Sequence, residues 1–443
     1  MSQTNLFIAP NKSQLQRIWQ LAWPLILSNL SVPLLGLVDT AIMGHLPHAR
    51  YLAAVTVGAT IITFVYWAFG FLRMGTVGLT AQAYGADDEA KQWQMLYLPG
   101  LLAVFIGLLI IALSPIFIPT AINYMQAADD VSLLAKEYLH IRIFSAPAVL
   151  MTYVGMGWLL GRQDSIGPLL ILILTNSSNI ILNLILVLGY KLDVAGVAWG
   201  SLIADYIGFA VAIFLIWRQL RPFASLRLSW GKSKAIMRQL VSLNGYLFIR
   251  TLVLLLVFAF VTAQSAQIST EVLAANTLLL QYITLLAHFL DGFAFAAEAS
   301  CGEKIGRQES NQFYQTVNAA GLYSLFLAVL SCLAFYWLHD FFFTLLTNLP
   351  AVLVLAKTYV LWVVWLPIIS VLSYLLDGVF VAGAQSKAMF HTVWVGALGM
   401  LIIWYMGEPS NHLLWLAFLS FFLLRTLVAI GFYLSLSYKQ SWW

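Results

Sequence analysis

Asp39 is a carboxylate near the end of a largely apolar segment, NLSVPLLGLVDTAIMGHL. An ionisable side chain in such a segment is unfavourable in hydrocarbon, which makes it a candidate for binding a proton or a cation. Pro24 lies fifteen residues earlier on the same predicted helix. Because proline lacks an N–H and clashes with the preceding turn, it gives a helix a straight and a kinked form. Protonation of Asp39 coupled to a bend at Pro24 is a candidate switch, and a static kink is the alternative.

Three asparagines project from one face of the segment TNSSNIILNLILVLGY. At 100° per residue, Asn176, Asn179 and Asn183 lie within about 60° of one another. In the next apolar segment Ser201 and Asp205 are four residues apart, so they are neighbours on one helical face. Two consecutive helices are therefore expected to bring amides, a hydroxyl and a second carboxylate together.

These side chains and Asp39 are predicted to form a polar chamber in the outer half of the first lobe. A low dielectric and a neighbouring carboxylate both make an acid harder to ionise, so Asp39 or Asp205 is expected to exchange protons with the outer side. For the asparagines, hydrogen bonding between helices is the alternative to a functional role.

The second half of the chain has acidic residues of its own inside the apolar segments LDGFAFAAEA and LLDGVFVAGAQ. Asp291 and Asp377 are each 20 residues from an outer charged residue, so they are predicted to lie toward the inner side. With Glu298 they form a candidate second polar site, for contact with a cationic substrate or for proton relay, and interfacial solvation is the alternative. Their candidate ion-pair partners are Arg73, Arg142 and Arg250.

The elements that position these residues are predicted to be membrane-spanning helices. The 443 residues are 61% hydrophobic and 9% charged, against roughly 25% charged in soluble proteins. Apolar stretches of about 20 residues cross a hydrocarbon core of about 30 Å, and helices satisfy their own backbone there. The sequence thus predicts an all-α integral membrane protein of twelve helices, at 17–43, 53–78, 93–118, 136–160, 167–190, 195–217, 237–265, 273–299, 313–337, 352–382, 388–406 and 413–437.

The cations between these segments indicate the orientation. With the amino terminus inside, fourteen Lys and Arg lie in inner segments and four in outer ones, so the positive-inside rule places both termini in the cytoplasm of an inner (plasma) membrane protein. Residues 1–16 are mostly polar, so no cleavable signal peptide is expected. A basic stretch between helices six and seven is interpreted as a cytoplasmic linker, residues 222–236, with binding of anionic lipid as the alternative.

The chain also contains an internal repeat. Residues 52–85 align with residues 273–306 at a shift of 221, half the chain. Two lobes of six helices, 1–221 and 237–443, would therefore have the same orientation and be related by a pseudo-two-fold axis along the membrane normal. This architecture is typical of secondary transporters.

Enzymatic chemistry is not predicted. Cys301 and Cys332 fit neither a disulfide framework nor a metal-ligand spacing and are interpreted as packing residues. The seven histidines form no ligand pattern, and no phosphate loop, nucleophile elbow or nucleotide-binding domain is found. Transport would then be driven by an ion gradient, without a cofactor or a resident metal, and no nucleic-acid partner is expected.

Four segments resemble one known family of transporters. AWPLILSNLSVPLLGLVDTAIMGHL is similar to the first helix of the multidrug and toxic compound extrusion (MATE) family, most closely its DNA-damage-inducible F (DinF) branch. NIILNLILVLGYKLDVAGVAWGSLIAD resembles the family's fifth and sixth helices, and LDGFAFAAEA and LDGVFVAGA resemble its eighth and tenth.

The resemblance implies an antiporter that exports lipophilic, mostly cationic drugs in exchange for protons or sodium ions. It is expected to work as a monomer among membrane lipids. The family's functional positions match Pro24, Asp39, Asn179 and Asn183. Relatives often have aspartate at the position of Asn183, so this chain lacks one carboxylate there. Proton coupling is therefore favoured, with sodium at Asp39, Asn179 and Asn183 as the alternative, and a lipid-linked glycan flippase as the alternative class.

Overall fold

The computed structural model describes residues 8–44, 48–220 and 230–443, with some positions near the ends of those ranges described by backbone alone. In this part of the chain all regular structure is helical. The contacts divide the chain into two units, which we name the N-terminal unit, Leu27–Leu240, and the C-terminal unit, Met1–Ile26 with Val241–Trp443. The first helix, α1 (Lys12–Gly44), contributes residues to both.

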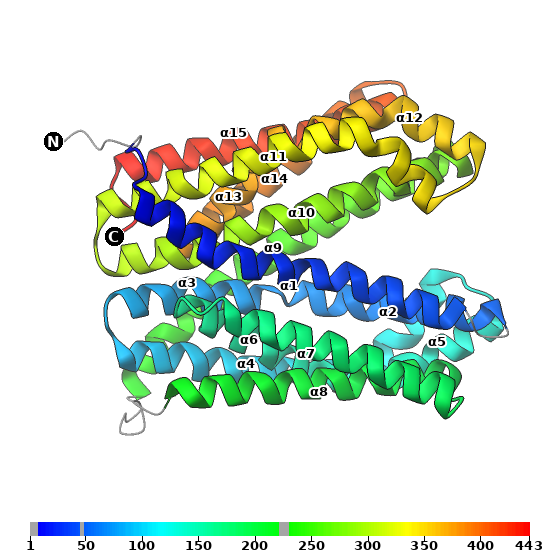
Figure 1. Ribbon diagram of the computed structural model, residues 1–443, viewed down its shortest axis with the longest axis horizontal. Helices are drawn as coiled ribbons and strands as arrows, with labels where there is room; N and C mark the ends of the chain where they lie inside the picture. The colour runs from blue at the N-terminus through cyan, green and yellow to red at the C-terminus, as the bar shows by residue number, and fades with distance from the viewer. Residues whose placement is uncertain (1–7, 45–47, 221–229) are drawn as a thin grey trace. The chain divides into compact units, whose positions relative to one another are not determined.

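The N-terminal unit contains seven further α-helices and two short non-α segments, a 3₁₀ turn η1 and a π-helical segment η2 (Figure 1). Their order and bounds are α2 (Ala49–Ala68), α3 (Phe71–Gly85), α4 (Glu89–Met125), α5 (Asp129–Arg142), η1 (Ile143–Ser145), α6 (Ala146–Gly161), α7 (Ile166–Asn183), η2 (Leu184–Gly189) and α8 (Asp193–Leu220).

The C-terminal unit repeats this order, with α9 (Trp230–Ile268) as its first long helix. The others are α10 (Thr270–Gly306), α11 (Ser310–Leu346), α12 (Pro350–Val364), α13 (Leu366–Ala382), α14 (Ser386–Met406) and α15 (Asn411–Tyr438).

The predicted membrane helices are present. Within the described residues, ten helices or continuous helix pairs are long and apolar enough to cross a membrane, and α12 with α13 forms an eleventh span bent by 48°. The 33-residue α1 completes the twelve. The helices extend beyond the predicted apolar stretches: α4 and α11 each have 37 residues, because backbone hydrogen bonding continues after the hydrophobic pattern ends.

The internal repeat is visible in the backbone. Helix α11 begins and ends 221 residues after α4, and the turns that precede these two helices share one conformation. Asp87 has φ 52° and Gln308, 221 residues later, has φ 58°. In each turn a backbone N–H bonds a carbonyl five residues earlier at 3.0 Å, Asp88 to Ala83 and Glu309 to Lys304. Equal turns and equal helices indicate one six-helix plan used twice.

Helix starts follow simple capping chemistry. The first N–H groups of a helix lack partners inside it, and a side-chain oxygen just before the helix supplies one. Asp88 accepts a hydrogen bond from the N–H of Lys91 at 2.9 Å at the start of α4. Ser269 does the same for Val272 at 3.1 Å at the start of α10. These caps set where each span begins.

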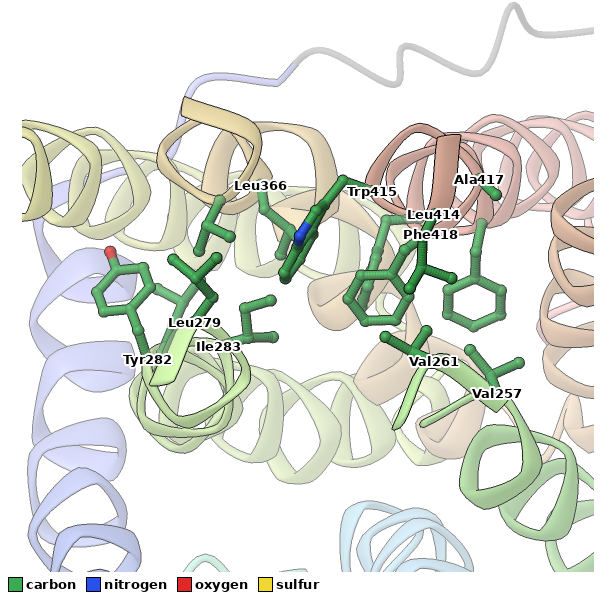
Figure 2. Packing of buried hydrophobic residues seen from close by; sticks show 14 of the residues in the cluster. Val257, Val261, Leu279, Tyr282, Ile283, Leu366, Leu414, Trp415, Ala417 and Phe418 are labelled. Atoms are coloured by element: carbon green, nitrogen blue, oxygen red, sulfur yellow. The ribbon is translucent and has the colours of Figure 1, made fainter. Parts of the chain in front are cut away.

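Apolar packing around Trp415 forms the centre of the largest core cluster, in the C-terminal unit. Figure 2 shows Trp415 and Phe418 of α15 among residues of α9, α10 and α13. The indole N–H of Trp415 donates to Asn276 Oδ1 at 2.9 Å, so its one polar atom is satisfied inside the core. The labelled neighbours are Val257, Val261, Leu279, Tyr282, Ile283, Leu366, Leu414 and Ala417.

The first part of α1 packs within the C-terminal unit. Ile18, Leu21 and Ala22 lie in a buried cluster with residues of α10, α11 and α13. A Cβ placed on Gly292 of α10 would lie 2.3 Å from Ile26, so this close approach requires glycine. The sequence analysis assigned residues 1–221 to one lobe, and it had no signal for this distribution of α1 between two units. Part of the predicted linker, residues 221–229, lies outside the described residues.

Candidate functional site

A chain of buried hydrogen bonds joins α7 to α8 in the N-terminal unit. The side-chain amide of Asn183 donates to Asn179 Oδ1 at 2.8 Å, and that of Asn179 donates to Ser201 Oγ at 2.8 Å. All three side chains are buried. The amide face predicted for this segment is therefore directed at α8, where it meets the serine that the sequence analysis placed beside it.

Glycines of α8 permit this close contact. A Cβ on Gly200 would lie 2.1 Å from Asn183 Oδ1, and one on Gly208 would lie 2.1 Å from Thr175 Oγ1. Small residues let two membrane helices approach until their side chains hydrogen-bond. Gly200 thus sets the position of the Asn183 amide.

Asn176 links α7 to α1. Its amide donates to Ser31 Oγ at 2.8 Å, and Ser31 Oγ donates in turn to the carbonyl of Ser28 at 2.7 Å. The sequence analysis grouped Asn176 with Asn179 and Asn183, but Asn176 bonds a different helix from the other two. Asp39 lies eight residues beyond Ser31 in α1. Its backbone is helical, and its side chain lies outside the described residues.

Asp205 of α8 forms an ion pair with Arg142, the last residue of α5, at 2.5 Å. The two side chains are 17% and 11% exposed. The sequence analysis proposed Arg142 as a partner for acids of the second half, and this was wrong. The 3₁₀ turn η1 interrupts the helix directly after Arg142, and the guanidinium is used between α5 and α8 of its own unit.

Two further groups hold Arg142 in place. Its Nη1 also donates to Ser145 Oγ at 3.1 Å. The hydroxyl of Tyr66, on α2, donates to the backbone carbonyl of Arg142 at 3.0 Å and lies 2.8 Å from Ser145 Oγ. The pair is therefore part of a network that spans α2, α5, η1 and α8.

In the C-terminal unit, Asp377 of α13 is paired with two arginines. Arg250 of α9, a predicted partner, and Arg425 of α15 both donate to its Oδ2. Sequence reasoning missed Arg425, although an arginine inside an apolar segment was a signal for it. The Arg425 guanidinium also lies 5.4 Å from the centre of the Tyr374 ring. One carboxylate shared by two guanidinium groups is not an open site for a cationic substrate.

The other two acids of the predicted second site lie on α10. Asp291 interacts electrostatically with Arg250 and Tyr374, which places it beside the Asp377 cluster. Glu298 is seven residues further along and 1% exposed. The structure thus brings Asp291 and Asp377 to one group of charges, with Glu298 two turns away.

A second ion cluster fixes the start of α1. Glu303 of α10 is 1% exposed and pairs with Arg17 of α1 and, at 3.0 Å, with Arg307. Thr316 of α11 donates to Gln14 at 3.2 Å. The sequence gave no indication of these contacts, because Arg17 and Glu303 are 286 residues apart.

Both predicted packing cysteines, Cys301 and Cys332, are free and buried. Among the residues that the structure describes, no group of three His, Cys, Asp or Glu side chains is arranged to hold a metal ion.

A multi-pass membrane protein built from two six-helix units, with polar groups buried inside each, is the layout of a transporter. The sequence model of the MatE family matches residues 24–185 and 247–406. The chain is 36% identical over 430 residues to DNA damage-inducible protein F of Escherichia coli, covering 96% of this chain and 92% of that protein. The chain therefore belongs to the MatE family, whose members are multidrug and toxic compound efflux transporters and not enzymes.

More distant relatives agree with this assignment. A probable multidrug resistance protein NorM of Halalkalibacterium halodurans is 22% identical over 407 residues, covering 88% of this chain and 85% of the relative. The crystal structure of the Vibrio cholerae MATE transporter VcmN matches with a TM-score of 0.83 at 20% identity, covering 97% of both chains. The structural likeness establishes the shared fold.

Proposed function

We propose that the chain exports lipophilic, mostly cationic compounds by proton antiport, with Asp39 as the protonation switch and Pro24 as the bending point of α1. The protein would act as a monomer in the inner (plasma) membrane, with both termini in the cytoplasm. The proton gradient would drive transport without a cofactor. The contact between α1 and α7 carries the proposal.

That contact brings the part of α1 containing Asp39 to the amide helix. Ser31 bonds Asn176 at 2.8 Å, and α1 and α7 are the first and fifth spans, so they run in the same direction. Asp39 is eight residues beyond Ser31 and Asn183 is seven beyond Asn176. At 1.5 Å per residue these are advances of about 12 and 10 Å. The Asp39 and Asn183 positions are thus at nearly the same depth.

The place of Pro24 supports its role in bending. Pro24 cannot donate a hydrogen bond to the carbonyl of Gln20, so α1 is weakened at this point. The helix passes from the C-terminal to the N-terminal unit between Ile26 and Leu27. The weak point therefore lies next to the place where α1 changes unit, and bending there would change how residues 27–44 lie on their own unit.

The charges in the N-terminal unit favour a proton over sodium. Asp205 is engaged by Arg142, and the position where relatives often have a second acid is the amide Asn183. Asp39 would then be the acid that takes up and releases the transported ion. A single carboxylate is sufficient for a proton, whereas sodium and other hard cations prefer several charged or polar oxygens.

Transport by everted membrane vesicles tests the proposal. Addition of a cationic dye should dissipate a respiration-driven proton gradient, and Asp39→Asn should abolish this response because the amide cannot exchange a proton. Asp340→Asn is the matched control, since Asp340 is an exposed acid of α11 that pairs with Lys357 at 2.9 Å. A full response in Asp39→Asn vesicles would refute the role of Asp39. A response to a sodium pulse without a pH gradient would assign the coupling to sodium.

A further inference from the structure

The ion pair between Arg142 and Asp205 lies beside the amide chain. Asp205 is one turn beyond Ser201 on α8, and residues four apart share a helical face. Ser201 accepts the hydrogen bond of Asn179, which accepts that of Asn183. A carboxylate, a hydroxyl and two amides therefore occupy adjoining turns of α7 and α8.

These oxygens are the ligand types that a hard cation prefers. The carboxylate is the strongest of them, and it is already occupied. Arg142 Nη1 donates to Asp205 Oδ2, and a guanidinium is charged at every pH a membrane protein meets. The side chain of Arg142 thus stands where a metal ion would have to bind Asp205.

The remaining groups around this carboxylate leave that charge balance unchanged. Tyr66 of α2, Tyr138 of α5 and Tyr153 of α6 interact electrostatically with Asp205 or Arg142. Phenols are neutral at physiological pH. Among the described groups that face the pair, Arg142 is the one that supplies a compensating positive charge.

We propose that Arg142 determines the ion specificity of the N-terminal unit, by holding its guanidinium on Asp205 in place of a metal cation. The inference rests on the proposed proton antiport and names the residue that excludes sodium from it. Arg142 is a specificity-determining residue and does not itself carry the transported proton.

Replacement of the guanidinium by a neutral amide tests this role. Arg142→Gln leaves Asp205 buried without its counter-ion, which favours binding of any small cation that reaches it. We expect Arg142→Gln in proteoliposomes to gain dye transport driven by a sodium gradient, about tenfold above that of the unsubstituted protein, which corresponds to about 1.4 kcal/mol. Sodium should also raise the melting temperature of the purified variant by about 2–4 °C.

Two variants serve as controls. Lys136→Gln removes one positive charge from an exposed position of the same helix, α5, and should show no sodium response. The double variant Arg142→Gln with Asp205→Asn removes both charges, so its sodium response should be lost again. The melting measurement needs no transport, and the double variant shows whether the site folds without the pair.

The outcomes separate this inference from the proposed function. If the unsubstituted protein is driven by protons through Asp39 but Arg142→Gln shows no sodium response in either measurement, the specificity role of Arg142 is wrong. An equal response in Lys136→Gln or in the double variant would also overturn it. Sodium-driven transport by the unsubstituted protein would overturn the proposed coupling itself.

Discussion

At the scale of single residues, the site depends on side chains that compensate one another. Asn183, Asn179 and Ser201 form a continuous hydrogen-bonded chain, and Arg142 neutralises Asp205. A buried polar group without a partner costs about 1–3 kcal/mol. The arrangement is therefore sensitive to small displacements of any one member.

Gly200→Ala should disturb the chain at Asn183. The new methyl group would lie 2.1 Å from Asn183 Oδ1, so the amide or one helix must move. We expect a loss of about 1–3 kcal/mol of stability, as for other overpacked sites, with a fall in dye efflux. Thermal unfolding of the purified protein and vesicle transport measure the two effects.

Gly431→Ala is the matched control, since a Cβ at this position of α15 would meet nothing within 4 Å. Alanine is the better residue in a helix by about 0.5–1 kcal/mol, so this variant should be as stable as the original or slightly more so. Unchanged stability and efflux in Gly200→Ala would mean that the α7–α8 contact has room to adjust.

At the scale of elements, α1 is the helix that the two units share. Its first part packs on α10 and α11 of the C-terminal unit. The part after Ile26 belongs to the N-terminal unit, where Ser31 bonds α7. A helix divided in this way transmits a bend at its weak point to one unit only, provided that the other end is fixed.

Pro24→Ala should make α1 a stronger helix. Alanine restores the N–H that can bond the carbonyl of Gln20, and a proline within a helix is unfavourable by about 3 kcal/mol. We expect slower amide hydrogen exchange at residues 24–28 and reduced dye efflux at normal protein levels. Unimpaired efflux together with the slower exchange would show that bending at Pro24 is dispensable.

At the scale of the whole molecule, one helical plan is used twice with different charges. Helices α4 and α11 match residue for residue in length. The ion pairs do not match: Arg142 and Asp205 join α5 to α8, whereas Asp377 joins α13 to α9 and α15. The shared plan supplies the scaffold, and the individual charges give each unit its own chemistry.

Glu303→Gln should loosen the start of α1 within the C-terminal unit. The amide keeps the shape of the side chain but removes the charge that pairs with Arg17 and Arg307. We expect a loss of about 2 kcal/mol, below the usual 3–5 for a buried pair because both arginines are partly exposed. Proteolysis near residues 8–20 should become faster.

The exchange of charges, Arg17→Glu with Glu303→Arg, tests whether attraction between these two residues is the cause. The exchange should recover part of the lost stability if Arg17 is the main partner. No recovery, with proteolysis as fast as in Glu303→Gln, would indicate that Arg307 or local packing matters more.

The sequence by itself determined the class of fold and most of the polar residues inside it. Apolar length predicts spans because hydrocarbon admits only self-satisfied helices, and the shift of 221 predicted the repeat. The amide face of α7 and the pairing of Ser201 with Asp205 on α8 followed from helical periodicity alone. Local rules were sufficient for these features, since each depends on residues that are close together along the chain.

Only the tertiary structure decided which charges meet. Arg142 and Asp205 are 63 residues apart and Arg250 and Asp377 are 127 apart, and periodicity carries no information over such separations. The division of α1 at Ile26 likewise depends on packing against α10 and α11. An ion pair forms where the folded chain brings opposite charges within a few ångströms, and that proximity is a property of helix packing.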